Sequence, residues 1–393
     1  MPRLFQTPHG RDIMLGAGLL SFAASLLRWP QECAQAARDA LSLCGHILIP
    51  SLFPFFVLSF LVVELGLSRY PGKLLEGIMF PLFRISGAGA SALVLGLVGG
   101  YPVGARTAVS LYQSGQCSKA ETERLLAFCN NAGPAFILSV VGSGLLGSVK
   151  LGLILYGIHA AASLLVGFLF RFYGTVHAPC KRTPVPVIQA VSFSTAFTCS
   201  VTSAFHSALN LCAFVLFFSI LIRILHMSGA ISAALGALSQ LFSPISLTLP
   251  FAPLLLPGFL EISSGISALS GAEPLSCQMI LAAFMLGWAG LSVHCQVLSF
   301  LVDSGLSPRF YFAGKLLHGC ISAVLAALAV NHLDLDLPAS ATPLLPITPL
   351  SWSALEEFLT ISVLLAIIAW ALFSLPVFLC AKKSSGNGKH HAL

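Results

Sequence analysis

The residues best suited to bind a ligand lie in an interrupted stretch of an otherwise very apolar chain. Residues 99–112 read GGYPVGARTAVSLY, with three glycines, a proline and the fixed positive charge of Arg106. Glycine and proline interrupt a membrane helix, and the half-helix that restarts after the break directs free N–H groups and a positive dipole end at a ligand. Because arginine holds a carboxylate through paired N–H donors, this stretch favours binding of an anion.

A second interrupted stretch, residues 257–269, reads PGFLEISSGISAL and places Glu261 inside an apolar segment. Acidic residues at membrane depth are costly and usually functional. Glu261 could carry a coupling proton, brace Arg106, or sit in water at the end of its segment. Arg106 has an alternative too, because its long side chain could extend to the membrane interface instead of touching a ligand.

Further polar residues interrupt the apolar segments that follow each of these stretches. Asn130 and Asn131 precede a Gly-Pro pair, and His294 and Gln296 occupy the corresponding region of the second half. Such side chains hydrogen-bond a ligand or stitch two helices together, and stitching is the commoner use. The expected substrate-binding residues are Gly99, Gly100, Tyr101, Pro102, Gly104, Arg106, Asn130, Asn131, Gly258, Glu261, Ser263, Ser264, His294 and Gln296.

The same residue types give little support to catalysis or metal binding. The sequence contains no GxSxG, HExxH or nucleotide-binding loop. His159 and His318 fall at matching positions late in the two halves, which favours packing over metal ligation. The eleven cysteines are scattered without a CxxC pair, so we interpret them as small buried hydrophobes. We therefore expect no catalytic residues, no metal and no cofactor, and do not expect an enzyme.

Composition places these residues in a membrane. Of the 393 residues, 56% are hydrophobic and only 9% are charged, and the mean hydropathy is +0.91. A soluble domain carries about 25% charged residues, so this chain cannot cover a surface that faces water. We predict an all-α polytopic membrane protein whose partner is the lipid bilayer. The net charge of +6 is spread over loops and does not indicate a nucleic-acid partner.

The hydropathy pattern predicts about eight transmembrane helices and two re-entrant, broken segments. The first span could instead be a cleaved signal peptide, because Ala34-Gln35-Ala36 resembles a cleavage site. The broken segments are expected at residues 88–112 and 245–271. The spans are expected at residues 12–29, 42–67, 125–147, 150–172, 206–227, 278–302, 310–330 and 355–380.

The two halves of the chain repeat each other at an offset of about 160 residues. DALSLCGHIL (39–48) matches SALNLCAFVL (207–216), and the two broken stretches match in order. An N-terminus inside the cell places 15 Lys and Arg residues at the inside and 3 at the outside, with Arg106 and Arg223 assigned to neither. Both termini are then cytoplasmic, and the halves become inverted repeats, which are typical of secondary transporters.

This layout predicts the boundaries of five segments. Two of these segments are repeats, and each repeat carries one broken stretch. The segments are an N-terminal transmembrane segment (1–38), a first repeat (39–172), a cytoplasmic linker (173–205), a second repeat (206–330), and a C-terminal part with an outer loop, a last helix and a basic tail (331–393).

Several stretches in this order resemble the sporulation integral membrane protein family, over roughly residues 40–330. They are GYPVGAR, SKAETERLLAF, CNNAGP (129–134), GFLEISSGISAL and LGWAGLSVHCQV (286–297). The resemblance implies two nucleoside-recognition "gate" domains and a permease of endospore-forming bacteria, in the cell membrane or the outer membrane of the forespore. Members of this group are associated with moving dipicolinate, an aromatic dicarboxylate.

The resemblance leaves other functions open. Gate domains also occur in nucleoside transporters and in iron-transport proteins, so a nucleoside is an alternative ligand. A membrane scaffold for spore assembly that transports nothing is a further alternative, although it would not need broken polar segments in both halves. Other sporulation membrane proteins or a second copy of the chain are the expected protein partners.

Overall fold

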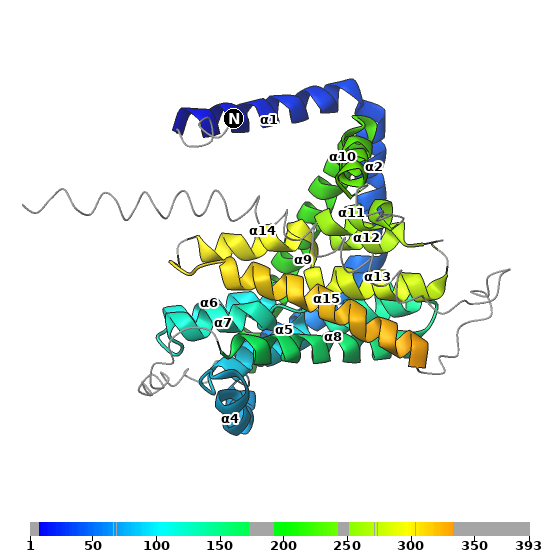
Figure 1. The fold of residues 1–393 in the computed structure, drawn as a ribbon. Coiled ribbons are helices and arrows are strands. Elements are labelled where there is room, and N and C mark those ends of the chain that lie inside the picture. The colour runs from blue at the N-terminus through cyan, green and yellow to red at the C-terminus, as the bar shows by residue number, and fades with distance from the viewer. Residues whose placement is uncertain are drawn as a thin grey trace, which may run out of the picture.

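The described part of the protein consists of helices joined by short connections (Figure 1). A computed structural model describes residues 8–65, 67, 69–172, 192–242, 251–270, 272, 274–302 and 304–332. Every regular element within these ranges is helical, which confirms the all-α prediction. Five of the helical segments are long and apolar enough to cross a membrane. The last span expected from the sequence, at residues 355–380, lies outside the described residues.

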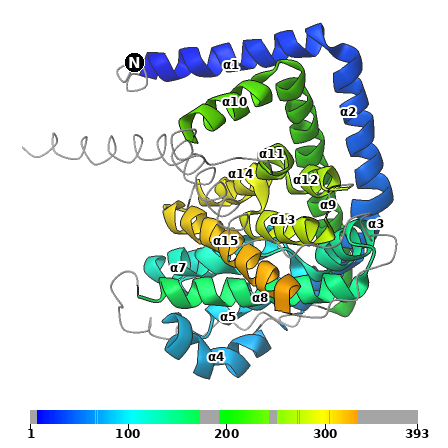
Figure 2. The ribbon, with the colours of Figure 1, turned by 45° about the vertical axis from the view of Figure 1, so that its right-hand side comes forward.

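The N-terminal helices form an arm and a long apolar segment. Helix α1 (Pro8–Arg28) projects from the other helices and is joined to them through α2 (Pro30–Leu43), as Figure 2 shows. The Phe22 ring of α1 contacts the Phe217 ring, with centroids 5.6 Å apart. Helix α2, the π-helix η2 (Cys44–Leu48) and α3 (Ile49–Glu64) follow one another without a break. The candidate span Pro30–Val62 therefore begins well before the residue 42 expected from the sequence.

The next helices make up the first repeat. Helix α4 (Arg69–Phe83) leads into a hairpin of α5 (Gly89–Gly99) and α6 (Val103–Gln113), which pack against each other. Helix α7 (Lys119–Cys129), the π-helix η3 (Phe136–Leu145) and α8 (Val149–Phe170) follow.

The same order recurs in the second half. Helices α9 (Phe193–Met227) and α10 (Ala230–Phe242) precede a hairpin of α11 (Ala252–Leu260) and α12 (Ile262–Ala268). Helices α13 (Leu275–Trp288), α14 (Gly290–Leu301) and α15 (Arg309–His332) complete it. Helix α9 begins at Phe193 and runs on from there, so part of the linker expected at residues 173–205 is helical.

Two segments expected as continuous spans are broken. The span expected at 125–147 is interrupted over residues 130–133, where Pro134 lacks the N–H that a continuing helix would need. The span expected at 278–302 is interrupted at Ala289, where Ala289 and Gly290 both adopt a φ of +79°. Each repeat therefore contains a hairpin and a broken helix, and the sequence pattern had revealed only the hairpin as re-entrant.

Three loops expected on the inside meet at one end of the molecule. The Glu121 carboxylate accepts a hydrogen bond from the Ser86 N–H at 2.9 Å, and the Glu123 carboxylate accepts one from the Ser307 N–H at 2.8 Å. Helix α7 therefore starts at the end of the molecule where α14 finishes. The matching broken helices run in opposite directions, as inverted repeats require.

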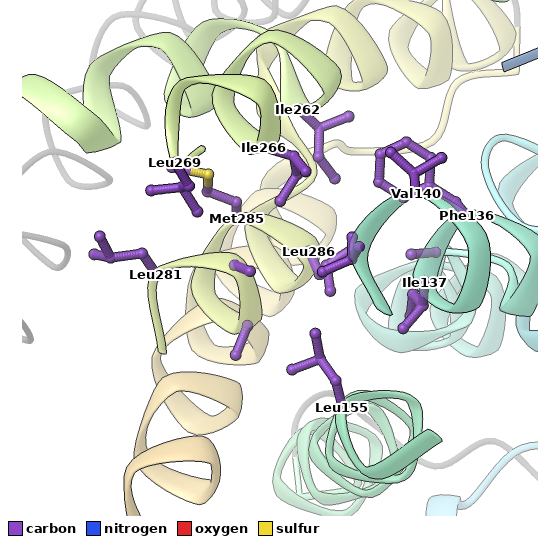
Figure 3. Packing of buried hydrophobic residues seen from close by; sticks show 14 of the residues in the cluster. Phe136, Ile137, Val140, Leu155, Ile262, Ile266, Leu269, Leu281, Met285 and Leu286 are labelled. Carbon is purple, nitrogen blue, oxygen red and sulfur yellow. The ribbon is translucent and has the colours of Figure 1, made fainter. Parts of the chain in front are cut away.

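The two halves share one apolar core around α13. Every residue of α13 is buried, so α13 lies inside the molecule and not against lipid. Figure 3 shows side chains of η3, α8, α12 and α13 converging there, among them Ile137, Leu155, Ile266 and Leu286. Because lipid is as apolar as these side chains, close packing and hydrogen bonds must hold this core together.

Candidate functional site

The tip of the first hairpin packs directly on the break between α7 and η3. Gly100 has a φ of +77°, and a Cβ there would lie 2.9 Å from the Gly133 nitrogen. Gly96 and Gly104 face the Cys129 carbonyl, to which an added Cβ would approach within 1.7 and 1.9 Å. Side chains at these positions would separate the two elements, so the glycines are needed for this approach.

The second repeat builds the same arrangement. Gly290 follows the break after α13, and a Cβ there would lie 3.1 Å from the Ile262 nitrogen and 3.4 Å from the Glu261 Cα. The tip of hairpin α11–α12 thus meets the break between α13 and α14. Gly258 supports this hairpin from within, because a Cβ built on Gly265 would lie 2.1 Å from its Cα.

Glu261 is buried at this second tip and serves the backbone. Its carboxylate oxygens accept hydrogen bonds from the Ser263 N–H at 2.9 Å and the Ser264 N–H at 2.6 Å, which are free donors in the first turn of α12. Within the described residues no ion pair joins Glu261 to Arg106. The structure therefore gives Glu261 a capping role and does not support the alternative that it braces Arg106.

A buried polar chain connects the two breaks. The Asn130 side chain donates to the Tyr311 hydroxyl at 3.4 Å, and that hydroxyl lies 2.8 Å from Nδ1 of His294. The His294 ring contacts Trp288 with ring centroids 4.4 Å apart. Asn130 and His294, which the sequence placed in separate halves, thus lie in one network, and Tyr311 joins them.

Tyr101 ties the first tip to the second repeat. Its hydroxyl donates a hydrogen bond to the Leu286 carbonyl near the end of α13. The second tip is bonded similarly, since the Trp288 indole N–H donates to the Phe259 carbonyl at 3.2 Å. Both hairpin tips are therefore hydrogen-bonded to the end of α13.

The buried network also contains Lys315, which the sequence did not predict there. Lys315 is one of the 15 Lys and Arg residues that were expected at the inside of the membrane, yet it is fully buried on α15. Its ammonium donates to the Asn130 carbonyl at 2.9 Å and lies 3.3 Å from Nδ1 of His318. The available signal was a lysine within an otherwise apolar helix, a placement that by default indicates function.

The two matching histidines contact each other. The rings of His159 and His318 have centroids 4.3 Å apart. The Ala132 N–H donates to Nε2 of His159 at 3.0 Å, and Nε2 of His318 donates to the His159 carbonyl at 2.9 Å. These bonds place the proton of His159 on Nδ1 and that of His318 on Nε2. The two histidines pack α8 against α15, in keeping with the packing role expected from the sequence.

Several buried polar atoms around the breaks have no hydrogen-bond partner in the described structure. Buried polar groups are nearly always bonded, so each exception calls for a partner such as a ligand. Asn131 is only half satisfied, because its Nδ2 donates to the Phe128 carbonyl at 2.9 Å while its Oδ1 is unbonded. The unbonded atoms near the breaks include Ser59 Oγ, Asn130 Oδ1, Asn131 Oδ1, His159 Nδ1, Ser263 Oγ, His294 Nε2 and Gln296 Nε2.

A cavity of about 400 Å³ lies beside the first hairpin tip. Pro102, Val103 and Arg106, where α6 begins, form one wall, and Gln296 of α14 belongs to another. Arg106 is exposed, and none of the described side chains that line the cavity is a carboxylate. The remaining lining residues are Phe60, Ser203, His206, Ser207, Asn210, Phe214, Ser299 and Phe300.

The expected site residues thus fall into three groups. Arg106, Pro102 and Gln296 line the cavity. Tyr101, Asn130 and His294 belong to the buried network. The remaining residues shape the two tips and the helix ends beside them, namely Gly99, Gly100, Gly104, Asn131, Gly258, Glu261, Ser263 and Ser264.

We compared the chain with protein families and with solved structures. No protein-family model matches the sequence. Solved structures of CNTnw overlap with it weakly. A variant in an intermediate state is 16% identical with a TM-score of 0.49, and the match covers 82% of this chain and 87% of that chain. CNTnw in an inward-facing substrate-bound state is 18% identical with a TM-score of 0.45, covering 82% and 87%.

The sequence match is stronger. The sporulation integral membrane protein YlbJ of Bacillus subtilis (strain 168) is 31% identical over 338 residues, which cover 80% of this chain and 82% of the relative. That relative is named as a membrane protein and not as an enzyme. The motifs at both tips and both breaks had indicated the same family. Identity at this level over most of both chains shows that this multi-pass membrane protein belongs to the sporulation integral membrane protein family.

Proposed function

We propose that the protein is a permease for a small carboxylated solute, and that dipicolinate is its substrate during sporulation. The observation that carries this proposal is the position of Arg106 on the wall of a cavity of about 400 Å³, whose described lining residues include no carboxylate. Ligand pockets typically measure about 300–1,000 Å³, so the cavity has room for a small aromatic dicarboxylate.

The electrostatics of the cavity favour an anion. Arg106 remains positively charged at any physiological pH and presents paired N–H donors that match a carboxylate. Helix α6 begins at Val103, which lines the same cavity, so the positive end of its dipole lies beside Arg106. The hydroxyl and amide groups of Ser203, Ser207 and Asn210 offer hydrogen bonds to a second polar group of the solute.

The broken helices supply the parts that transport requires. Irregular backbone at membrane depth is tolerated where it is buried in protein or lines a watery cavity, and both tips lie beside such a break. The two repeats run in opposite directions, so rocking of one against the other would open the site to alternate sides. We further propose cytoplasmic termini, a location in the cell membrane or the forespore outer membrane, and a solute gradient or partner as the energy source.

Uptake into proteoliposomes tests this function. Vesicles with wild-type protein, with Arg106→Ala, or without protein receive labelled dipicolinate, other carboxylates and nucleosides in parallel. We expect carboxylate uptake by the wild type and a loss of about tenfold to hundredfold in Arg106→Ala, the value of one charge-assisted hydrogen-bond pair. Arg28→Ala is the matched control, because Arg28 ends α1 and does not line the cavity.

The alternatives give different results in this assay. A scaffold that transports nothing would leave uptake equal in empty and protein-bearing vesicles. A nucleoside-type transporter would take up nucleosides in preference to carboxylates, with little dependence on Arg106. Either result would refute the proposal.

A further inference from the structure

The buried amine of α15 carries an inference that rests on the proposed transport function. We propose that Lys315, with His318 as its partner, binds a proton that crosses the membrane together with the anion. The sequence suggested Glu261 as one candidate for such a proton. The structure favours Lys315, because both oxygens of the Glu261 carboxylate are hydrogen-bonded to the start of α12.

In the part of the chain that the structure describes, the surroundings of Lys315 contain hydrogen-bond acceptors but no counter-charge. Lys315 is 0% exposed, and its Nζ lies 2.9 Å from the Asn130 carbonyl, 3.3 Å from Nδ1 of His318 and 5.3 Å from the centre of the Tyr101 ring. A buried charge without an opposite charge is costly, while acceptors and an aromatic face recover part of that cost. Such an amine can hold a proton in one conformation and release it in another.

Among the described residues, no carboxylate faces this amine from the elements packed around it. The titratable side chains near Lys315 come from the first hairpin and from α7, α8, α14 and α15 itself. All of them are neutral in their ordinary states at pH 7 or are imidazoles. They are Tyr101, Cys129, His159, His294, Tyr311 and His318. The charge at this position is therefore set by protonation of the Lys315–His318 pair.

His318 gives the proton a second place to reside. Its Nε2 donates to the His159 carbonyl, so Nδ1 is the free acceptor that faces the Lys315 ammonium. Transfer along this bond moves one proton from Nζ to Nδ1, which leaves a neutral amine and an imidazolium. No other bond forms or breaks, and the number of protons on the Lys315–His318 pair does not change during this transfer.

The position of Lys315 links its charge to the cavity. It lies on α15 of the second repeat, yet it bonds the Asn130 carbonyl at the break of the first repeat. The Tyr101 ring above it belongs to the hairpin tip, and the adjacent Pro102 lines the cavity beside Arg106. Charge-assisted hydrogen bonds are about twice as strong as neutral ones, so loss of the proton loosens the break on which the tip rests. Proton binding and the conformation of the cavity are thereby coupled.

The first repeat lacks this feature and supplies a matched control. Lys315 precedes His318 by the same spacing at which Tyr156 precedes His159. Tyr156 donates from its hydroxyl to the Leu97 carbonyl at 3.3 Å and carries no charge at pH 7. Tyr156→Phe removes a hydrogen bond at the corresponding place without changing a charge.

The test measures anion accumulation against proton movement in the same proteoliposomes. The membrane potential is held at zero with potassium and valinomycin, the outside is made one pH unit more acidic, and an entrapped dye reports internal pH. Exchange of labelled for unlabelled dipicolinate without a gradient is recorded in parallel. One coupled proton yields about tenfold accumulation per pH unit at zero potential.

We expect this accumulation, with matching internal acidification, in the wild type and in Tyr156→Phe. Lys315→Arg keeps the positive charge and the donors but does not release its proton, so we expect exchange without pH-driven accumulation. Lys315→Met fixes the neutral state and should lose the accumulation as well. Size-exclusion profiles show which variants fold, and His318→Gln serves as a third variant with the same expected loss of proton coupling.

The contrary results distinguish failure of the proton-coupling role from failure of the proposed transport function. Accumulation by Lys315→Arg equal to that of the wild type would assign Lys315 a purely structural role and overturn the inference. Exchange by the wild type without any proton movement would also overturn it, while leaving the proposed function intact. Absence of exchange in the wild type would refute the proposed function, and the coupling role with it.

Discussion

One added methyl group at Gly104 tests whether the first hairpin docks on the broken end of α7. A Cβ there would lie 1.9 Å from the Cys129 carbonyl oxygen, about 1.5 Å short of ordinary van der Waals contact. The obstacle is backbone, so it cannot turn aside as a flexible side chain would. Overpacking of this kind costs about 1–3 kcal/mol, which corresponds to roughly 1–4 °C in melting temperature for a chain of 393 residues.

The assay is thermal unfolding in detergent, followed by size-exclusion chromatography after heating. We expect Gly104→Ala to melt at a lower temperature than the wild type and to take up less anion, because the displaced hairpin carries Pro102 and Arg106 on the cavity wall. Gly157→Ala is the matched control. It lies in α8, where an added Cβ would meet nothing within 4 Å, and alanine there should be neutral or stabilising by up to about 1 kcal/mol. Equal melting of Gly104→Ala and wild type would refute the described packing.

Further predictions concern the second tip and the topology. Glu261→Ala should lower stability by about 1–3 kcal/mol because two N–H donors of α12 lose their partner, with Glu261→Gln intermediate; unchanged melting of the alanine variant would mean that those donors are satisfied otherwise. In a cysteine-free background, Ser114→Cys and Lys150→Cys should react with an impermeant thiol reagent from opposite sides of the membrane, because α7 and η3 lie between them. Reaction of both from the same side would contradict the proposed inverted repeats.

Composition and repeat matching were sufficient to predict the helical class and the two hairpins. Hydropathy marked the membrane segments, and the Gly-Pro and Glu-Ser clusters marked the tips at residues 100–102 and 261. The breaks after α7 and α13 were not predicted, because the segments that contain them were expected to be continuous spans. The isolated glycines Gly287 and Gly290 flank the second break, but they did not show that Ala289 between them adopts a φ of +79°. Tertiary contacts override local preference there.

The site was predicted in part, for a related reason. Arg106, Asn130 and His294 were identified because polar residues in apolar segments are conspicuous. Lys315 was missed because charge counting assigned it to the nearest loop, and only the contact between α15 and the first break shows that it is buried. Tyr311 was missed too, since its role depends on an Asn and a His that are far apart in the sequence.

Binding of labelled dipicolinate to the purified protein addresses the role of the cavity most directly. Equilibrium binding in detergent removes gradients, orientation and turnover from the comparison of wild type with Arg106→Gln. On the proposed function we expect saturable binding that weakens by about tenfold to hundredfold in Arg106→Gln, since a neutral amide cannot replace the charged pair of donors. Equal affinity in the two proteins, or no binding to either, would contradict the assignment of this cavity to a carboxylated solute.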